Sequence, residues 1–157
     1  MLHLSTVEST TLELLKKLQQ LSVLCNTRLV GGTALALQLG RRKSGGLDFF
    51  GQSNVDSQDL KEALRTLGTL TILNDSKNIH IYVLNEVKID IVNYTYPWLD
   101  DVVYKDGIRL ASPRDIAAMK ITAIEGRGTK KRFCRYLLFV EKVFIEKSIG
   151  FLFSKIS

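Results

Sequence analysis

Apolar residues recur along this chain with two different periods, which predict helices in some stretches and strands in others. Steps of three and four residues are typical of an amphipathic helix, and short runs rich in Val, Ile and aromatic residues are typical of strands. A Gly pair opens one helical run, and single glycines are natural stops at helix ends. The expected helices in the first half of the chain are Val7–Leu24, Thr33–Leu39 between Gly31-Gly32 and Gly40, and a run capped by Asp56 that closes at Gly68.

The expected strands cluster in the middle of the chain. Three consecutive runs separated by the polar turns Asn74–Lys77 and Asn85-Glu86 predict an antiparallel meander. Pro113 at a first helical position starts a helix to about Glu125, and a last long helix is expected from Thr129 to about Phe144. The expected strands are Arg28–Val30, Leu47–Phe50, Leu70–Leu73, Ile79–Leu84, Val87–Asn93 and Ile108–Leu110.

This mixed order of helices and strands predicts a single α+β (mixed α/β) domain over residues 1–157, with a core at about 26–110 and a helical C-terminal part at about 112–157. The 157 residues are 45% hydrophobic and carry a net charge of +6, which suits a compact domain with a sizeable core. No apolar run approaches the roughly 18 residues of a membrane helix, and the N-terminus lacks a signal-peptide pattern. We therefore expect a cytoplasmic protein without a membrane partner.

The first candidate for chemistry is the strand-to-helix turn at Gly31, Gly32 and Thr33. Two glycines let a backbone approach a ligand closely, and a helix N-terminus attracts phosphate through its free N–H groups. A plain tight turn is the alternative interpretation of the glycine pair.

Two strand aspartates are the second candidate. Asp48 is bracketed by Leu47 and Phe49, and Asp90 by Ile89 and Ile91, so each carboxylate lies on the face opposite its apolar neighbours. With only two Cys and two His in the chain, metal chemistry has to use carboxylates, and Mg²⁺ commonly bridges such groups to phosphates. The alternative is that each aspartate caps a turn or is simply exposed.

Basic residues near the end of the chain form the third candidate. Lys120 belongs to an otherwise apolar helix face, where it either reaches a phosphate or extends past the edge of the core. A dense basic cluster follows it, which is either a solvated helix face or a surface for a polyanion such as RNA. Its members are Arg127, Lys130, Lys131, Arg132 and Arg135.

Taken together, these segments resemble the AbiEii/AbiGii nucleotidyltransferase toxins, a branch of the DNA polymerase β-like nucleotidyltransferase superfamily. The matches occur in order over most of the chain. The segments that carry the resemblance are Leu29–Gly40, Arg42–Ser44, Leu47–Phe50, Lys88–Val92, Gly107–Ser112, Asp115–Lys120 and Gly126–Lys131.

The resemblance implies a mixed sheet flanked by helices and the transfer of a nucleotide from an NTP, with Mg²⁺ or Mn²⁺, to an RNA such as tRNA. It also implies a cognate antitoxin as partner. Asp48 and Asp90 would bind metal and act in catalysis with Lys120, which would steady phosphate charge. The nucleotide would be held by Gly31, Gly32, Thr33, Arg42 and Ser44.

Three positions depart from the family pattern. Gly46 stands where the family signature has the first of two aspartates, and Arg132 and Arg135 stand where relatives usually carry acids. One carboxylate cannot bridge metals as a pair at i and i+2 does. The leading hypothesis is therefore a nucleotidyltransferase-fold toxin homologue with weakened or lost activity, and the alternatives are a non-catalytic RNA- or protein-binding homologue that uses the Arg127–Arg135 surface and a folded remnant with neither activity.

Overall fold

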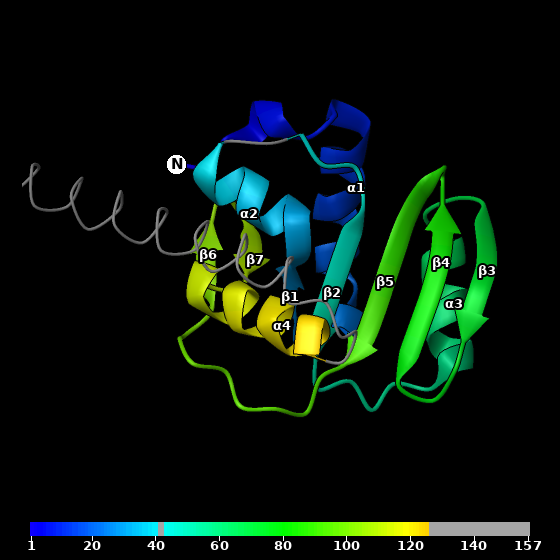
Figure 1. The fold of residues 1–157 in the computed structure, drawn as a ribbon. Coiled ribbons are helices and arrows are strands. Elements are labelled where there is room, and N and C mark those ends of the chain that lie inside the picture. The colour runs from blue at the N-terminus through cyan, green and yellow to red at the C-terminus, as the bar shows by residue number, and fades with distance from the viewer. Residues whose placement is uncertain (41–42, 126–157) are drawn as a thin grey trace, which may run out of the picture. The chain divides into compact units, whose positions relative to one another are not determined.

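The computed structural model describes residues 1–40 and 43–125, which form a mixed sheet with helices on its faces (Figure 1). The helices are η1 (Leu4–Thr6), α1 (Ser9–Gln20), η2 (Ser22–Leu24), α2 (Gly31–Leu39), α3 (Ser57–Arg65) and α4 (Pro113–Glu125). The strands are β1 (Thr27–Val30), β2 (Leu47–Gly51), β3 (Leu70–Asp75), β4 (Ile79–Leu84), β5 (Val87–Asn93), β6 (Val103–Lys105) and β7 (Ile108–Leu110).

The seven strands form one sheet in the order β3-β4-β5-β2-β1-β7-β6. The meander β3-β4-β5 is antiparallel, as the sequence predicts, and β5 then pairs in parallel with β2. β2 is antiparallel to β1, and β1 is parallel to β7. Because β2 and β5 lie side by side, residues about 40 positions apart in the sequence become neighbours in the middle of the sheet.

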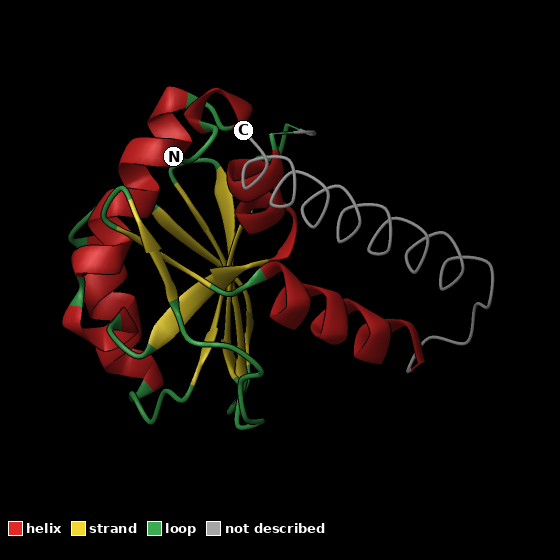
Figure 2. Ribbon diagram, turned by 90° about the vertical axis from the view of Figure 1, so that its left-hand side faces the viewer, coloured by secondary structure: helices red, strands yellow, loops and turns green. Residues whose placement is uncertain are grey.

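The two faces of the sheet have different environments. One face is the core, where Leu47, Phe49 and Ile89 have no solvent exposure, and α1 and α3 lie on this side (Figures 1 and 2). The opposite face carries α2 over β1 and β2. Several strand residues that point to this second face, such as Phe50 and Val92, are half-buried, whereas Val30 is buried.

The chain divides into two compact units, Met1–Ile116 and Ala117–Ser157. The whole sheet belongs to the first unit, and the described part of the second is the remainder of α4. The prediction of one domain over residues 1–157 stays a prediction. In the described residues no helix is long and apolar enough to cross a membrane.

The sequence predicts the element order well and several boundaries less well. The first helix is shorter than Val7–Leu24, because Leu21 adopts an extended conformation and separates α1 from η2. β3 continues through Asn74 and Asp75, which the pattern assigned to a turn. The expected helix from Thr129 to Phe144 lies outside the described residues.

One strand, β6, has no counterpart among the sequence predictions. It pairs with β7 through the turn at Asp106 and Gly107, whose φ angles are 52° and 75°. Asp-Gly with two positive φ angles is typical of a tight hairpin turn. That dipeptide is the sequence signal that could have predicted β6.

Candidate functional site

The two strand aspartates are direct neighbours in the sheet. Asp48 of β2 is in register with Asp90 of β5, and the two strands run parallel. Neighbouring parallel strands lie about 4.8 Å apart, and residues in register point to the same face. The structure therefore brings the two predicted carboxylates together on the second face of the sheet.

The glycine turn meets this pair at Asp48. β1 ends at Val30, which is in register with Asp48, and α2 begins at Gly31 with a φ of 73°. A Cβ built on Gly31 would overlap Oδ2 of Asp48 and would lie 3.2 Å from its Cγ. Only a glycine leaves room for the carboxylate at this point of the turn, and a positive φ also favours glycine.

Among the described residues, one carboxylate oxygen of Asp90 has a partner and the other has none. Lys88 Nζ lies 3.2 Å from Asp90 Oδ2. Oδ1 is buried and accepts no hydrogen bond from the described residues. A buried carboxylate oxygen without a donor is costly, and a bound cation would satisfy it.

A hydroxyl pair ties the start of α2 to the segment that precedes β2. Thr33 Oγ1 donates to the carbonyl oxygen of Gly46, and it lies 2.8 Å from Ser44 Oγ. A Cβ on Gly32 would lie 3.4 Å from the same Ser44 oxygen. Gly32, Thr33 and Ser44 therefore meet at the N-terminus of α2, whose N-cap residue Val30 offers no side-chain cap.

This arrangement suits one divalent cation. The two carboxylates lie in register on adjacent strands, and one of them has an oxygen without a donor among the described residues. Carboxylate oxygens are ligands that Mg²⁺ prefers. Among the described residues no group of three or more His, Cys, Asp or Glu could hold a metal. The protein ligands present are therefore the pair Asp48 and Asp90, with other positions left to phosphate and water.

Among the remaining predicted site residues, only Lys120 lies within the described part of the chain. Lys120 is exposed on α4 and belongs to the second unit. Arg42 lies outside the described residues, and so does the whole basic cluster of Arg127, Lys130, Lys131, Arg132 and Arg135. Lys88 enters the sequence predictions only as the start of the segment Lys88–Val92, and its ion pair with Asp90 is not predicted from the sequence.

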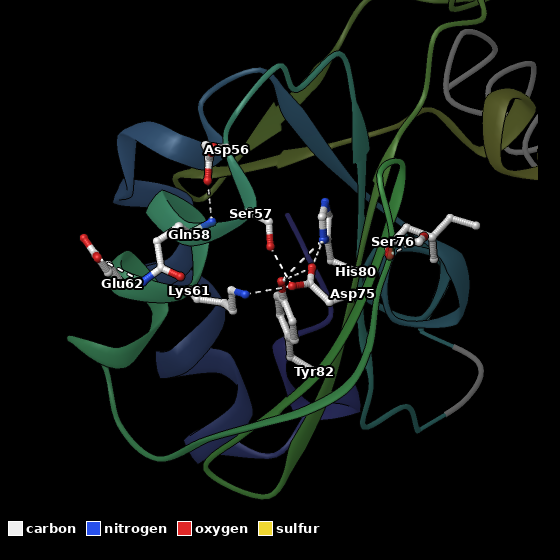
Figure 3. A network of polar contacts seen from close by, with 10 residues as sticks. Asp56, Ser57, Gln58, Lys61, Glu62, Asp75, Ser76, His80 and Tyr82 are labelled. Carbon is white, nitrogen blue, oxygen red and sulfur yellow. Dashed lines mark hydrogen bonds and ion pairs between the residues drawn. The ribbon is translucent and has the colours of Figure 1, made fainter.

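A second polar cluster occupies the core side of the sheet and holds α3 on the strands (Figure 3). Asp75 Oδ2 accepts from Lys61 Nζ at 2.8 Å and Ser57 Oγ at 2.6 Å. Oδ1 lies 2.6 Å from His80 Nδ1 and accepts from the Tyr82 hydroxyl at 3.0 Å. Both oxygens are satisfied, so we interpret this cluster as structural.

The ionisation of this cluster follows from its contacts. The hydrogen bonds from Lys61 and Ser57 hold the pKa of Asp75 well below its usual range. Burial, together with the hydrogen bond to Asp75, raises the pKa of Tyr82 to about 12. Asp75 therefore stays ionised and Tyr82 stays neutral across the ordinary pH range.

Comparison with known proteins adds a family match. A family model described as nucleotidyl transferase AbiEii toxin, type IV TA system, matches residues 13–133. An uncharacterized protein of Aquifex aeolicus (strain VF5), aq_aa25, is 35% identical over 125 residues, which are 77% of this chain and 61% of the relative. The chain thus spans about three fifths of the length of that relative.

Solved structures with the same fold are more distant in sequence. One is ANT(2")-Ia in complex with adenylyl-2"-tobramycin, with 14% identity, a TM-score of 0.60, and coverage of 89% of this chain and 92% of that one. Another is JHP933 from Helicobacter pylori, with 21% identity, a TM-score of 0.51, and coverage of 73% and 57%. A candidate nucleotidyltransferase from the same organism, also 21% identical with a TM-score of 0.51, covers 73% and 59%. These likenesses confirm the predicted mixed α+β nucleotidyltransferase fold.

Proposed function

Because this chain belongs to the AbiEii nucleotidyl transferase toxin family, we propose that it transfers a nucleotidyl group from an NTP to an RNA acceptor such as tRNA, with Mg²⁺ or Mn²⁺. In this reaction a hydroxyl of the acceptor forms a bond to the α-phosphorus. The bond between the α- and β-phosphates breaks, pyrophosphate leaves, and the hydroxyl proton passes to solvent.

The observation that carries this proposal is the register of Asp48 with Asp90 beside the Gly31 turn. The two carboxylates would hold the divalent ion, and the unsatisfied Oδ1 of Asp90 is a ligand that suits it. A bound divalent ion supplies charge stabilisation to the phosphates. Through the bound ion, the two carboxylates would hold the phosphates near the N-terminus of α2, and a helix N-terminus favours anions.

The other predicted residues would position the nucleotide. The N-terminus of α2 at Gly31, Gly32 and Thr33 would donate N–H groups to the phosphates, and the Ser44 hydroxyl lies next to it. Arg42 and Lys120 would add positive charge, a role that the family resemblance implies for both. Positioning and electrostatic stabilisation of the transferred group account for most of the rate in such reactions.

We expect this transfer to be slow. Gly46 provides no carboxylate at the position where the family pattern has one, so the site has two acidic ligands instead of three. The family also suggests a cognate antitoxin as a partner. An RNA-bound state would use the basic cluster from Arg127 to Arg135.

The test is to incubate the purified chain with Mg²⁺, total tRNA and each of the four NTPs labelled at the α-phosphate. We expect labelled RNA with at least one NTP and loss of the label in Asp48→Asn, with Asp56→Asn, an exposed helix cap, as the matched control. If Gly46→Asp labels RNA and the natural chain does not, the proposal that the natural chain transfers nucleotides is overturned and the chain is a degenerate enzyme. Salt-sensitive RNA binding without labelling by either protein would favour the non-catalytic binding homologue.

A further inference from the structure

Lys88 places a positive charge inside the candidate site. Its ammonium nitrogen lies 3.2 Å from Asp90 Oδ2, and its side chain is 57% exposed, against 22% for Asp90. An exposed ion pair of this kind is weak, because water screens it and two flexible side chains must be held. The ammonium can therefore leave Asp90 at little cost when a stronger anion arrives.

The sheet register places Lys88 at one corner of a four-residue square. Leu47 pairs with Ile89 and Asp48 with Asp90, so Gly46 lies beside Lys88 one step earlier. A Cβ on Gly46 would indeed lie 3.8 Å from the Lys88 carbonyl oxygen. The corners of the square are two carboxylates, one ammonium group and one glycine that leaves space.

The other charged side chain on this part of the face has fixed partners. Arg28 lies in register with Phe50, donates to the carbonyl oxygen of Asp100 at 3.0 Å, and stacks over the Trp98 ring at 4.3 Å. On β4, the residues in register with Asp90 and Lys88 are Ile81 and Val83, which carry no charge. Among the described residues of β1, β2, β4 and β5 on this face, Lys88 is thus the cation whose only described partner is a site carboxylate.

Charge balance explains what this ammonium can do. Two carboxylates and one divalent ion are neutral together, so a bound triphosphate brings uncompensated negative charge. Sites with two divalent ions neutralise such charge with the second ion. Here the two carboxylates of Asp48 and Asp90 suit one ion, and Lys88 lies next to Asp90.

We propose that Lys88 is a phosphate-binding residue of the nucleotide site, whose ammonium pairs with Asp90 in the empty protein and moves to the triphosphate when nucleotide and one divalent ion bind. This proposal rests on the proposed function, because it assigns a ligand to the same site. Lys88 serves there as a tethered second cation.

Removal of the charge should change two affinities in opposite directions. In Lys88→Met we expect Mn²⁺ alone to bind about fivefold more tightly, because a competing cation leaves Asp90. Inorganic tripolyphosphate in the presence of Mn²⁺ should bind about fivefold more weakly in the same variant. Lys88→Arg should bind tripolyphosphate as the natural chain does, since it keeps the charge.

The experiment is a Mn²⁺ titration followed by electron paramagnetic resonance and a tripolyphosphate titration followed by calorimetry. Lys105→Met is the matched control, because Lys105 is an exposed lysine on β6 at the far edge of the sheet, and both of its affinities should be unchanged. The Mn²⁺ titration of the natural chain should give one ion per chain.

The outcomes separate this proposal from the proposed function. If Asp48→Asn loses Mn²⁺ binding while Lys88→Met changes neither affinity, or lowers both, the role of Lys88 is wrong and the carboxylate site stands. If the natural chain binds neither Mn²⁺ nor tripolyphosphate at millimolar concentrations, both proposals are wrong.

Discussion

Replacing Gly31 by alanine should disrupt the site and destabilise the fold, whereas the same change at Gly32 should do little. Gly31 has a φ of 73°, and a Cβ there would overlap the Asp48 carboxylate. Gly32 has no such φ, and its Cβ would lie 3.4 Å from Ser44 Oγ, a contact close to the ordinary range. The two neighbouring glycines are therefore a matched pair.

The expected magnitude follows from two contributions. A left-handed conformation costs a residue with a Cβ about 1–2 kcal/mol, and Asp48 must also rotate away from the turn. In Gly32→Ala the loss of glycine within a helix stabilises by up to about 1 kcal/mol, which offsets the contact with Ser44. The two variants should differ by about 2 kcal/mol in the free energy of unfolding, or roughly 4–8 °C in Tm for a chain of this length.

Urea denaturation and a Mn²⁺ titration on the same samples measure both consequences. Gly31→Ala should lose stability and Mn²⁺ affinity together, because Asp48 is displaced, while Gly32→Ala keeps both. Equal stability of the two variants would refute the conformational argument. If Gly31→Ala is destabilised but keeps its Mn²⁺ affinity, the inference that the turn and the proposed metal ligand Asp48 depend on each other is refuted.

Three further changes test other parts of the structure. Gly46→Asp should tighten Mn²⁺ binding in a titration without changing unfolding by more than about 0.5 kcal/mol, since its Cβ has room. The pKa of Asp75 is lowered in the folded chain, so the stabilisation by its carboxylate is present above about pH 4 and is lost as the pH falls further. Urea titrations from pH 6 to 2 should therefore show a smaller loss of the free energy of unfolding in Asp75→Asn than in the natural chain. Arg109→Lys should cost about 2 kcal/mol in urea denaturation, because the guanidinium donates to the carbonyl oxygens of Gln19, Leu24 and Thr27.

Local patterns in the sequence predict the elements because their causes are local. The αL conformation of Gly40 ends α2 where a glycine stop was expected. Asp56 caps α3, because its Oδ1 accepts a hydrogen bond from the backbone N–H of Gln58 at 2.6 Å. The alternation around Asp48 and Asp90 correctly places their apolar neighbours in the core. Leu21 was misassigned because its apolar spacing continues the helical period although its backbone leaves the helix.

The geometry of the candidate site depends on contacts that are distant in sequence. The alternation of apolar and polar residues predicts on which face of its strand each of Asp48 and Asp90 lies. Only the pairing of β2 with β5 makes the two residues neighbours. Alternation alone also leaves open whether Lys88 contacts Asp90 or extends into solvent. The hydroxyl contact of Thr33 with Ser44 likewise depends on the path of the chain between α2 and β2.

The residue at position 46 determines both the number of acidic ligands and the net charge of the candidate site. The Gly46 carbonyl accepts a hydrogen bond from Thr33, so the backbone at this position is fastened to the start of α2. A side chain added there would therefore change the charge of the square and leave the path of the strand as it is. With glycine, the two carboxylates and Lys88 sum to −1, and an aspartate would make the sum −2. A comparison of Gly46→Asp with the double variant Gly46→Asp, Lys88→Met thus separates the contribution of each charge to ion binding on an unchanged backbone.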